Sequence, residues 1–200
     1  MNDLISRRRE RAAAAWNLRD ELVVIGAGPL IYRPGYADQT FHYLPHAEHF
    51  YLTDRERPDS VLAYDARGGW RDFVPEVTAD DRVWTGDVPD VGEPIDGLGA
   101  WLAERRGRPV ANLGSPVPGV SADPELTSRV REILFAVRRP KDATELDRMR
   151  RAAEATHAGF AAARAVIRPG EKKKKNQKKL KTPFTRGGAP GPAYDSIVGT

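Results

Sequence analysis

Short apolar segments separated by turn residues run from Leu22 to Leu113, and this pattern constrains the fold more than any other feature. The chain has 16 prolines and 18 glycines in 200 residues, so its elements are short and its turns frequent. Longer segments with apolar residues at three- and four-residue spacing lie among these runs. Strands interspersed with helices predict an α/β fold, in which helices cover a sheet.

Six segments have the length and composition of strands. They are Leu22–Ile25, Phe50–Thr53, Ser60–Tyr64, Trp70–Val74, Arg82–Thr85 and Pro109–Leu113. Turn residues such as the run from Arg67 to Gly69 separate several of them. The sequence therefore predicts a sheet of several short strands.

Helical spacing predicts four helices. They cover residues 2–16, 95–105, 123–135 and 142–167, the last beginning with Asp142 and Glu145 at capping-box spacing. Pro169 and Gly170 are expected to end it. In the first helix we place the four arginines on the solvent side, and these are Arg7, Arg8, Arg9 and Arg11.

The segment Gly26-Ala27-Gly28 follows a predicted strand, as the glycines of a dinucleotide-binding turn do. The third small residue of that fingerprint would stand at position 31, which is Ile31, and Pro29 obstructs a helix there. A tight turn after the strand is the favoured interpretation.

Three histidines, His42, His46 and His49, have the spacing of a zinc site on one helical face. Pro45 and the aromatic residues around them favour extended structure instead. We therefore expect half-buried histidines near a sheet edge. No phosphate loop, HExxH motif or Ser-His-Asp arrangement is present, and the carboxylates are scattered.

The net charge of +4 comes from one segment. Residues 171–181 contain seven lysines and one glutamate and contribute +6, so the rest of the chain sums to −2. Three interpretations stay open: a reading-frame or assembly error in the gene, a solvated segment, or a tail that binds phosphates. No aromatic residue interleaves with the lysines, so we do not expect nucleic-acid binding.

The chain has no cysteine, which excludes disulfides and thiolate metal sites. No apolar run approaches the length of a membrane span. The arginines after Ser6 are not followed by the apolar segment of an export signal. We expect a soluble cytoplasmic protein without membrane contact.

Three segments together resemble the creatinase/aminopeptidase P family of Xaa-Pro aminopeptidases. Residues 38–70 are similar to the N-terminal domain of these enzymes. Residues 138–153, with Arg168, Pro169 and Gly170, resemble the interdomain linker and the first helix of the catalytic domain. Residues 192–199 resemble the strand that follows the second helix. The segments occur in the family's order, and residues 171–185 depart from the family pattern.

The resemblance implies a creatinase-like N-terminal domain over residues 1–137, with a mixed β-sheet flanked by helices. Residues 138–200 would be the helical start of a pita-bread metallopeptidase domain, including the lysine-rich residues 171–181. In the family this domain binds two metal ions, usually manganese, through two Asp, one His and two Glu. None of these ligands has a counterpart before Thr200, so we expect no metal bound by this chain. By resemblance alone, Tyr194 matches a tyrosine of the substrate pocket.

We therefore expect an N-terminal fragment of a manganese-dependent Xaa-Pro aminopeptidase, inactive alone. The family reaction releases the N-terminal residue of peptides with proline at the second position. The alternative is a non-catalytic oligomerisation or binding module, because the helix from Asp142 would expose an apolar face without the catalytic sheet. Homo-oligomer formation is the partner expectation that follows.

Overall fold

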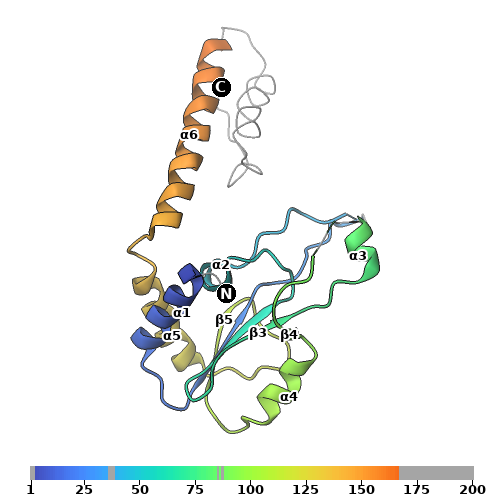
Figure 1. The fold of residues 1–200 in the computed structure, drawn as a ribbon, viewed down its shortest axis with the longest axis vertical. Coiled ribbons are helices and arrows are strands. Elements are labelled where there is room, and N and C mark those ends of the chain that lie inside the picture. The colour runs from blue at the N-terminus through green and yellow to red at the C-terminus, as the bar shows by residue number, and fades with distance from the viewer. Residues whose placement is uncertain (1–2, 36–38, 85, 87, 167–200) are drawn as a thin grey trace. The chain divides into compact units, whose positions relative to one another are not determined.

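The computed structural model describes residues 3–35, 39–84, 86 and 88–166 (Figure 1). The chain divides into two compact units, Met1–Arg139 and Pro140–Thr200. The elements of the first unit are α1 (Asp3–Trp16), β1 (Leu22–Gly26), α2 (Ala47–Thr53), β2 (Val61–Asp65), β3 (Gly69–Val74), α3 (Ala79–Trp84), β4 (Glu93–Pro94), α4 (Gly97–Ala103), β5 (Val110–Gly114) and α5 (Pro124–Val137). The second unit contains α6 (Ala143–Val166).

The five strands form one mixed sheet in the order β4-β3-β2-β1-β5. β1 pairs with β5 and β3 with β4 in parallel, whereas β2 is antiparallel to both of its neighbours. The predicted mixed sheet with flanking helices is confirmed, and four of the six predicted strands correspond to β1, β2, β3 and β5. The dinucleotide interpretation fails as expected, because β1 ends at Gly26 and no helix follows directly.

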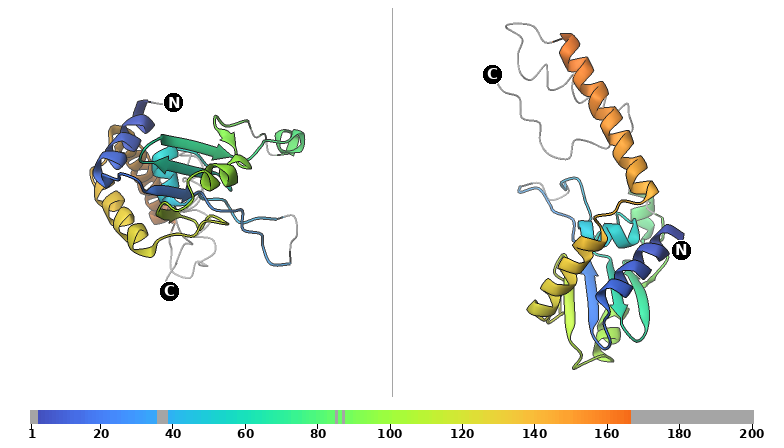
Figure 2. Two further views of the ribbon diagram at one scale, coloured as in Figure 1. Left: turned by 90° about the horizontal axis from the view of Figure 1, so that it is seen from below. Right: turned by 90° about the vertical axis from the view of Figure 1, so that its left-hand side faces the viewer.

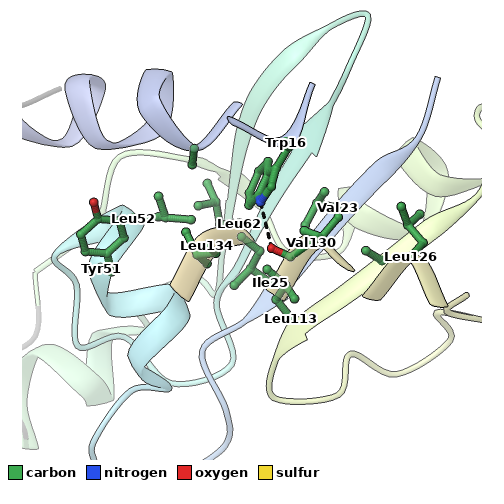
Figure 3. Close-up of a cluster of buried hydrophobic side chains, with 12 residues drawn as sticks. Trp16, Val23, Ile25, Tyr51, Leu52, Leu62, Leu113, Leu126, Val130 and Leu134 are labelled. Atoms are coloured by element: carbon green, nitrogen blue, oxygen red, sulfur yellow. Dashed lines mark hydrogen bonds between the residues drawn. The ribbon is translucent and has the colours of Figure 1, made fainter. Parts of the chain in front are cut away.

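Each face of the sheet carries its own apolar core. Side chains of α1, α2 and α5 cover one face, where the indole Nε1 of Trp16 donates to the carbonyl oxygen of Val130 at 3.1 Å (Figure 3). α4 covers the other face, through Leu98 and Trp101 packed against Phe73. Figure 2 shows α1 and α5 beside each other, on the side of the sheet away from α4.

Arg8 and Arg9 of α1 are buried, so the prediction that they face solvent is wrong. They are only 2% and 3% exposed. Arg9 donates to both carboxylate oxygens of Asp72, at 2.7 and 2.8 Å, and to the carbonyl oxygen of Leu52 at 2.9 Å. Arg8 donates to the carbonyl oxygen of Tyr51 at 3.1 Å. The two arginine side chains can be buried because carbonyl oxygens in the last turn of α2 and a carboxylate on β3 accept their hydrogen bonds. Their aliphatic stems pack as apolar groups.

The predicted strand Phe50–Thr53 is helical and belongs to α2. The helix begins where the His46 ring accepts the backbone N–H of Glu48 at 3.5 Å. It ends at Asp54, which has a left-handed backbone and donates its N–H to the carbonyl oxygen of Phe50 at 2.8 Å. Packing of the helix against the sheet overrides the strand preference of its aromatic residues.

The predicted strand Arg82–Thr85 is also wrong, because residues 79–84 form α3. Thr78 and Asp81 make a reciprocal cap: the Thr78 N–H donates to the Asp81 carboxylate at 2.9 Å, and the Asp81 N–H donates to the Thr78 hydroxyl at 3.1 Å. This Thr-x-x-Asp spacing is a variant of the capping box, so the sequence did contain a helix signal here.

The outer edge of β5 is closed by α5. The N–H of Asp123 donates to the carbonyl oxygen of Val110, and the N–H of Asn112 donates to the hydroxyl of Thr127 at 3.1 Å. Arg131 donates to the carbonyl oxygen of Asn112 at 3.3 Å. Groups that could pair with another strand are thereby occupied, so the sheet does not extend at this edge.

The second unit begins with the predicted capping box. The N–H of Glu145 donates to the Asp142 carboxylate at 2.9 Å, and the N–H of Asp142 donates to the Glu145 carboxylate at 3.1 Å. Along α6, Met149 and Phe160 are 57% and 63% exposed. The predicted end of this helix and the lysine-rich residues 171–181 lie outside the described residues. Across residues 3–166, apart from the three undescribed gaps, we find no helix with the length and apolar character of a bilayer span.

Candidate functional site

The sheet face that α4 covers also carries a groove of about 810 Å³. Its floor and walls come from β1, β2, α4, β5 and the segment after β5. The apolar lining includes Leu22, Val61, Leu98, Leu102, Val110 and Val117. α4 is only seven residues long, so it covers part of this face, and the groove is the part beside it.

Charged residues lie at the two ends of the groove. Arg105, Arg106 and Arg108 belong to the turn between α4 and β5, at the end where β1 and β5 begin. Asp59 lies at the opposite end, where its N–H donates to the carbonyl oxygen of Gly28 just beyond the end of β1. The groove is therefore apolar along its length, positive at one end and negative at the other.

The buried carboxylate of Asp65 holds two of these arginines. Arg105 Nε lies 2.8 Å and Arg108 Nη2 2.6 Å from its oxygens. The hydrogen bond from Arg108 is the main reason that the pKa of Asp65 lies well below its ordinary value. Arg106 is exposed and makes no ion pair with any residue that the structure describes.

His49 is the centre of a buried polar cluster on α2. Its Nδ1 lies 3.3 Å from the hydroxyl of Thr53, and its Nε2 lies 3.3 Å from the hydroxyl of Ser60. Burial lowers the pKa of His49 from 6.5 to about 4, so the ring is neutral at pH 7. Ser60 also donates to the carbonyl oxygen of Arg57 at 2.8 Å. Both side chains are buried, so no substrate reaches this serine and histidine, and the cluster is structural.

The three histidines of the predicted spacing do not come together. His42 is exposed in a loop, His46 caps α2, and His49 is 1% exposed within that helix. The expectation of half-buried histidines near a sheet edge is therefore wrong. Among the residues described, no group of three His, Cys, Asp or Glu could hold a metal ion. This part of the chain does not fit the metal pair of the resembled family.

Glu48 is a buried carboxylate that joins three elements. It accepts the N–H of Gly114 in β5 at 2.5 Å and the Nε of Arg131 in α5 at 3.1 Å. Its position beside His49 in the sequence gave no sign of this role, because both partners are more than 60 residues away. The sequence reasoning missed Glu48, together with the groove.

Exposed apolar residues gather on α3 and the segment that follows it. Val83, Trp84, Val88 and Val91 are 78%, 84%, 75% and 84% exposed. Single exposed apolar residues are ordinary, but four within nine residues of the sequence are more than solvent exposure alone favours, as in an interaction surface. We call these four residues the α3 patch.

Tyr194, assigned by resemblance to a substrate pocket, lies outside the described residues, and its role stays a prediction. The part of the chain described by the structure therefore offers two candidate sites. One is the groove beside α4, and the other is the α3 patch. Neither was predicted from the sequence.

Comparison with known proteins finds a family match within the first unit. Residues 5–102 match the family model of the aminopeptidase P N-terminal domain. Proline aminopeptidase P II from Yersinia pestis is 21% identical, with a TM-score of 0.74 over 100% of this chain and 53% of that one. Aminopeptidase PepP from Pseudomonas aeruginosa is 24% identical, with a TM-score of 0.71 over 96% and 51%.

Aminopeptidase P from E. coli, solved with the inhibitor Pro-Leu, is 20% identical, with a TM-score of 0.73 over 98% of this chain and 52% of that one. The chain thus spans about half the length of the solved structures it matches. These likenesses establish the fold. No curated protein matches the sequence.

Proposed function

Residues 5–102 belong to the aminopeptidase P N-terminal domain family, and from that premise we propose that the chain is the N-terminal part of a Xaa-Pro aminopeptidase. The observation that carries the proposal is the family match, supported by fold similarity over the whole chain to several aminopeptidase P structures. The reaction of the complete enzyme would release the N-terminal residue from peptides with proline at the second position. The compartment that we propose is the cytoplasm.

We also propose that these 200 residues alone have no peptidase activity. In the aminopeptidase P family, the residues that bind the metal ions, usually manganese, belong to the pita-bread domain. The residues of this chain that match the family model belong to the N-terminal domain. Residues 138–200 would contribute the start of that domain, with Tyr194 at its substrate pocket. The manganese chemistry would then depend on residues that follow this chain.

The gene beyond codon 200 tests this assignment. We expect a downstream reading frame, continuous or shifted, that encodes the Asp, Asp, His, Glu and Glu ligand set. Resequencing would also show whether codon usage across residues 171–185 matches its flanks. A locus without any such ligand set would contradict the assignment to a Xaa-Pro aminopeptidase.

A second function, self-association, is favoured by the α3 patch. Val83 and Trp84 are more than three-quarters exposed, and water contact with such a patch is unfavourable by about 25 cal/mol per Å² of apolar area. We propose that a second copy of the chain covers it in a homo-oligomer. The exposed apolar residues of α6 add a further surface of the same kind in the second unit.

Sedimentation velocity of the wild type and of Trp84→Ser tests self-association through the patch. We expect the wild type to sediment as an oligomer and Trp84→Ser to shift toward the monomer at equal concentration. Phe135→Ser, at a half-exposed phenylalanine of α5, is the matched control and should leave the distribution unchanged. A wild-type chain that is monomeric at all concentrations would contradict the proposal.

A further inference from the structure

We propose that the groove beside α4 binds a short apolar peptide in extended conformation with both of its termini free. The inference goes beyond the proposed function, because it needs neither a metal ion nor a catalytic domain. It rests on the shape of the groove, its apolar lining and the opposite charges at its ends.

The apolar lining of the groove favours a ligand whose middle part is apolar. Leu22, Val61, Leu98 and Val117 belong to the buried core cluster of this sheet face, and the partly buried side chains packed against it line the groove; these are Ile95, Leu102, Val110 and Val120. A volume of about 810 Å³ is large enough for a ligand of several residues, since ligand pockets usually measure about 300–1,000 Å³. Displacing water from such walls favours a ligand with aliphatic side chains.

The charges at the two ends of the groove favour a ligand with one charged group at each end, of opposite sign. Arg106 at one end and Asp59 at the other are exposed, and neither has an ion-pair partner among the residues of the described ranges. Arg105 and Arg108 are already held by Asp65, so Arg106 is the cation available to a ligand. A carboxylate would lie at Arg106 and an ammonium group at Asp59, which are the two termini of a peptide.

The length of the groove sets the length of the peptide. Its two ends are separated by β1, whose four residue steps span about 13 Å at a rise of about 3.3 Å per residue. The contact of Asp59 with Gly28 places the negative end two residues beyond β1. An extended peptide of about four to six residues has a matching distance between its termini.

Isothermal titration calorimetry with the complete 200-residue chain tests the proposal. The probe is a tetrapeptide of alternating leucine and alanine, without proline, in free, N-acetylated and C-amidated forms. We expect saturable binding of the free peptide and about fivefold weaker binding of each blocked form, as expected for a partly exposed ion pair. Asp59→Asn should remove the effect of acetylation, and Arg106→Gln should remove the effect of amidation.

Gly99→Leu fills the groove without threatening the fold. Gly99 lines the groove from α4, and a Cβ at this position meets no atom within 4 Å. Leucine also favours a helix more than glycine does. We expect this variant to keep its circular dichroism spectrum and to lose peptide binding. Glu10→Gln and Arg7→Gln, at exposed positions of α1, are the charge-matched controls and should bind like the wild type.

Three results would overturn the peptide site. The free tetrapeptide fails to bind, Gly99→Leu binds as well as the wild type, or the blocked peptides bind as tightly as the free one. Decanoate, an apolar chain with a carboxylate alone, separates a peptide site from a general apolar site. Decanoate binding as tight as that of the tetrapeptide, with no effect of Asp59→Asn, would also contradict the proposal. None of these outcomes depends on peptidase activity.

Discussion

Several buried residues of the first unit are polar or charged, and partners from other elements satisfy them. Arg9 on α1 meets Asp72 on β3, which also accepts a hydrogen bond from Arg55 at 3.1 Å. His49 on α2 meets Ser60 in the segment before β2. Such groups are costly to separate, because each would leave a buried polar atom without a partner.

Arg9→Ala tests whether the buried guanidinium stabilises the fold. It leaves the Asp72 carboxylate without its two-fold donor and removes the packed stem, so we expect a loss of about 3 kcal/mol in the free energy of unfolding. Arg7→Ala is the matched control on the same helix; the Arg7 side chain is 71% exposed, and we expect a change below about 0.5 kcal/mol. Urea denaturation of both variants measures the difference, and equal midpoints would show that Arg9 is not stabilising.

We expect the buried His49 to lower the free energy of unfolding in acid. Burial lowers its pKa to about 4 in the folded state from 6.5 in the unfolded state. Below pH 6.5 the unfolded chain binds a proton that the folded chain does not, so the free energy of unfolding falls as the pH decreases toward 4. The full loss from this residue is about 3 kcal/mol.

Urea denaturation between pH 7 and pH 4.5 measures this dependence on His49. His49→Gln has no titrating ring, and its unfolding free energy should fall less over this range than that of the wild type. His42→Gln, at an exposed loop position, serves as the control for the substitution itself. A wild-type stability that falls no more steeply than that of His49→Gln would contradict the assigned shift.

The burial of the arginines could not be predicted from the sequence. A run of three arginines beside exposed helix positions has the pattern of a solvent face, and the pattern holds for Arg7. What buries Arg9 is Asp72, 63 residues along the chain. A one-dimensional pattern contains no information about a partner at that separation.

At the level of elements, local signals predicted most of the fold. Asp123, at the first residue of the predicted helix 123–135, caps α5 through its side chain, and Asp142 with Glu145 caps α6 as the capping-box spacing predicted. The strands bounded by turns were predicted as well. The two predicted strands that are helical in the structure, α2 and α3, are short helices of seven and six residues rich in aromatic or β-branched residues. Their composition favours strands, and tertiary packing or a side-chain cap decides otherwise.

Gly26 lies at the end of β1, where the chain after β5 leaves no room for a side chain. A Cβ at this position would overlap with the carbonyl oxygen of Ser115, which follows β5. We expect Gly26→Ala to lower the free energy of unfolding by about 2 kcal/mol, as overpacking against backbone does. Gly99→Ala, in the open helical position on α4, should leave stability equal or higher.

Thermal unfolding of the two alanine variants measures this contrast. The melting temperature should fall for Gly26→Ala and stay level or rise for Gly99→Ala. If Gly26→Ala were as stable as the wild type, the close approach of β1 to the segment after β5 would be wrong.

For the whole molecule, the sequence predicted the family and the mixed sheet but neither candidate site. The resemblance depended on segments whose residue types and order are recognisable along the chain. The groove depends on side chains from three strands, α4 and a turn, and its end charges, Asp59 and Arg106, are 47 positions apart in the sequence. The α3 patch was missed because Val83 and Trp84 were assigned to a strand.

The most direct test of the central claim is a peptidase assay of the purified 200-residue chain. The chain is incubated with manganese and peptides that have proline at the second position, after removal of contaminating peptidases. The account predicts no release of the N-terminal residue, because the proposed N-terminal part of the enzyme would lack the metal ligands of the resembled family. Release that co-purifies with the chain and requires manganese would contradict it.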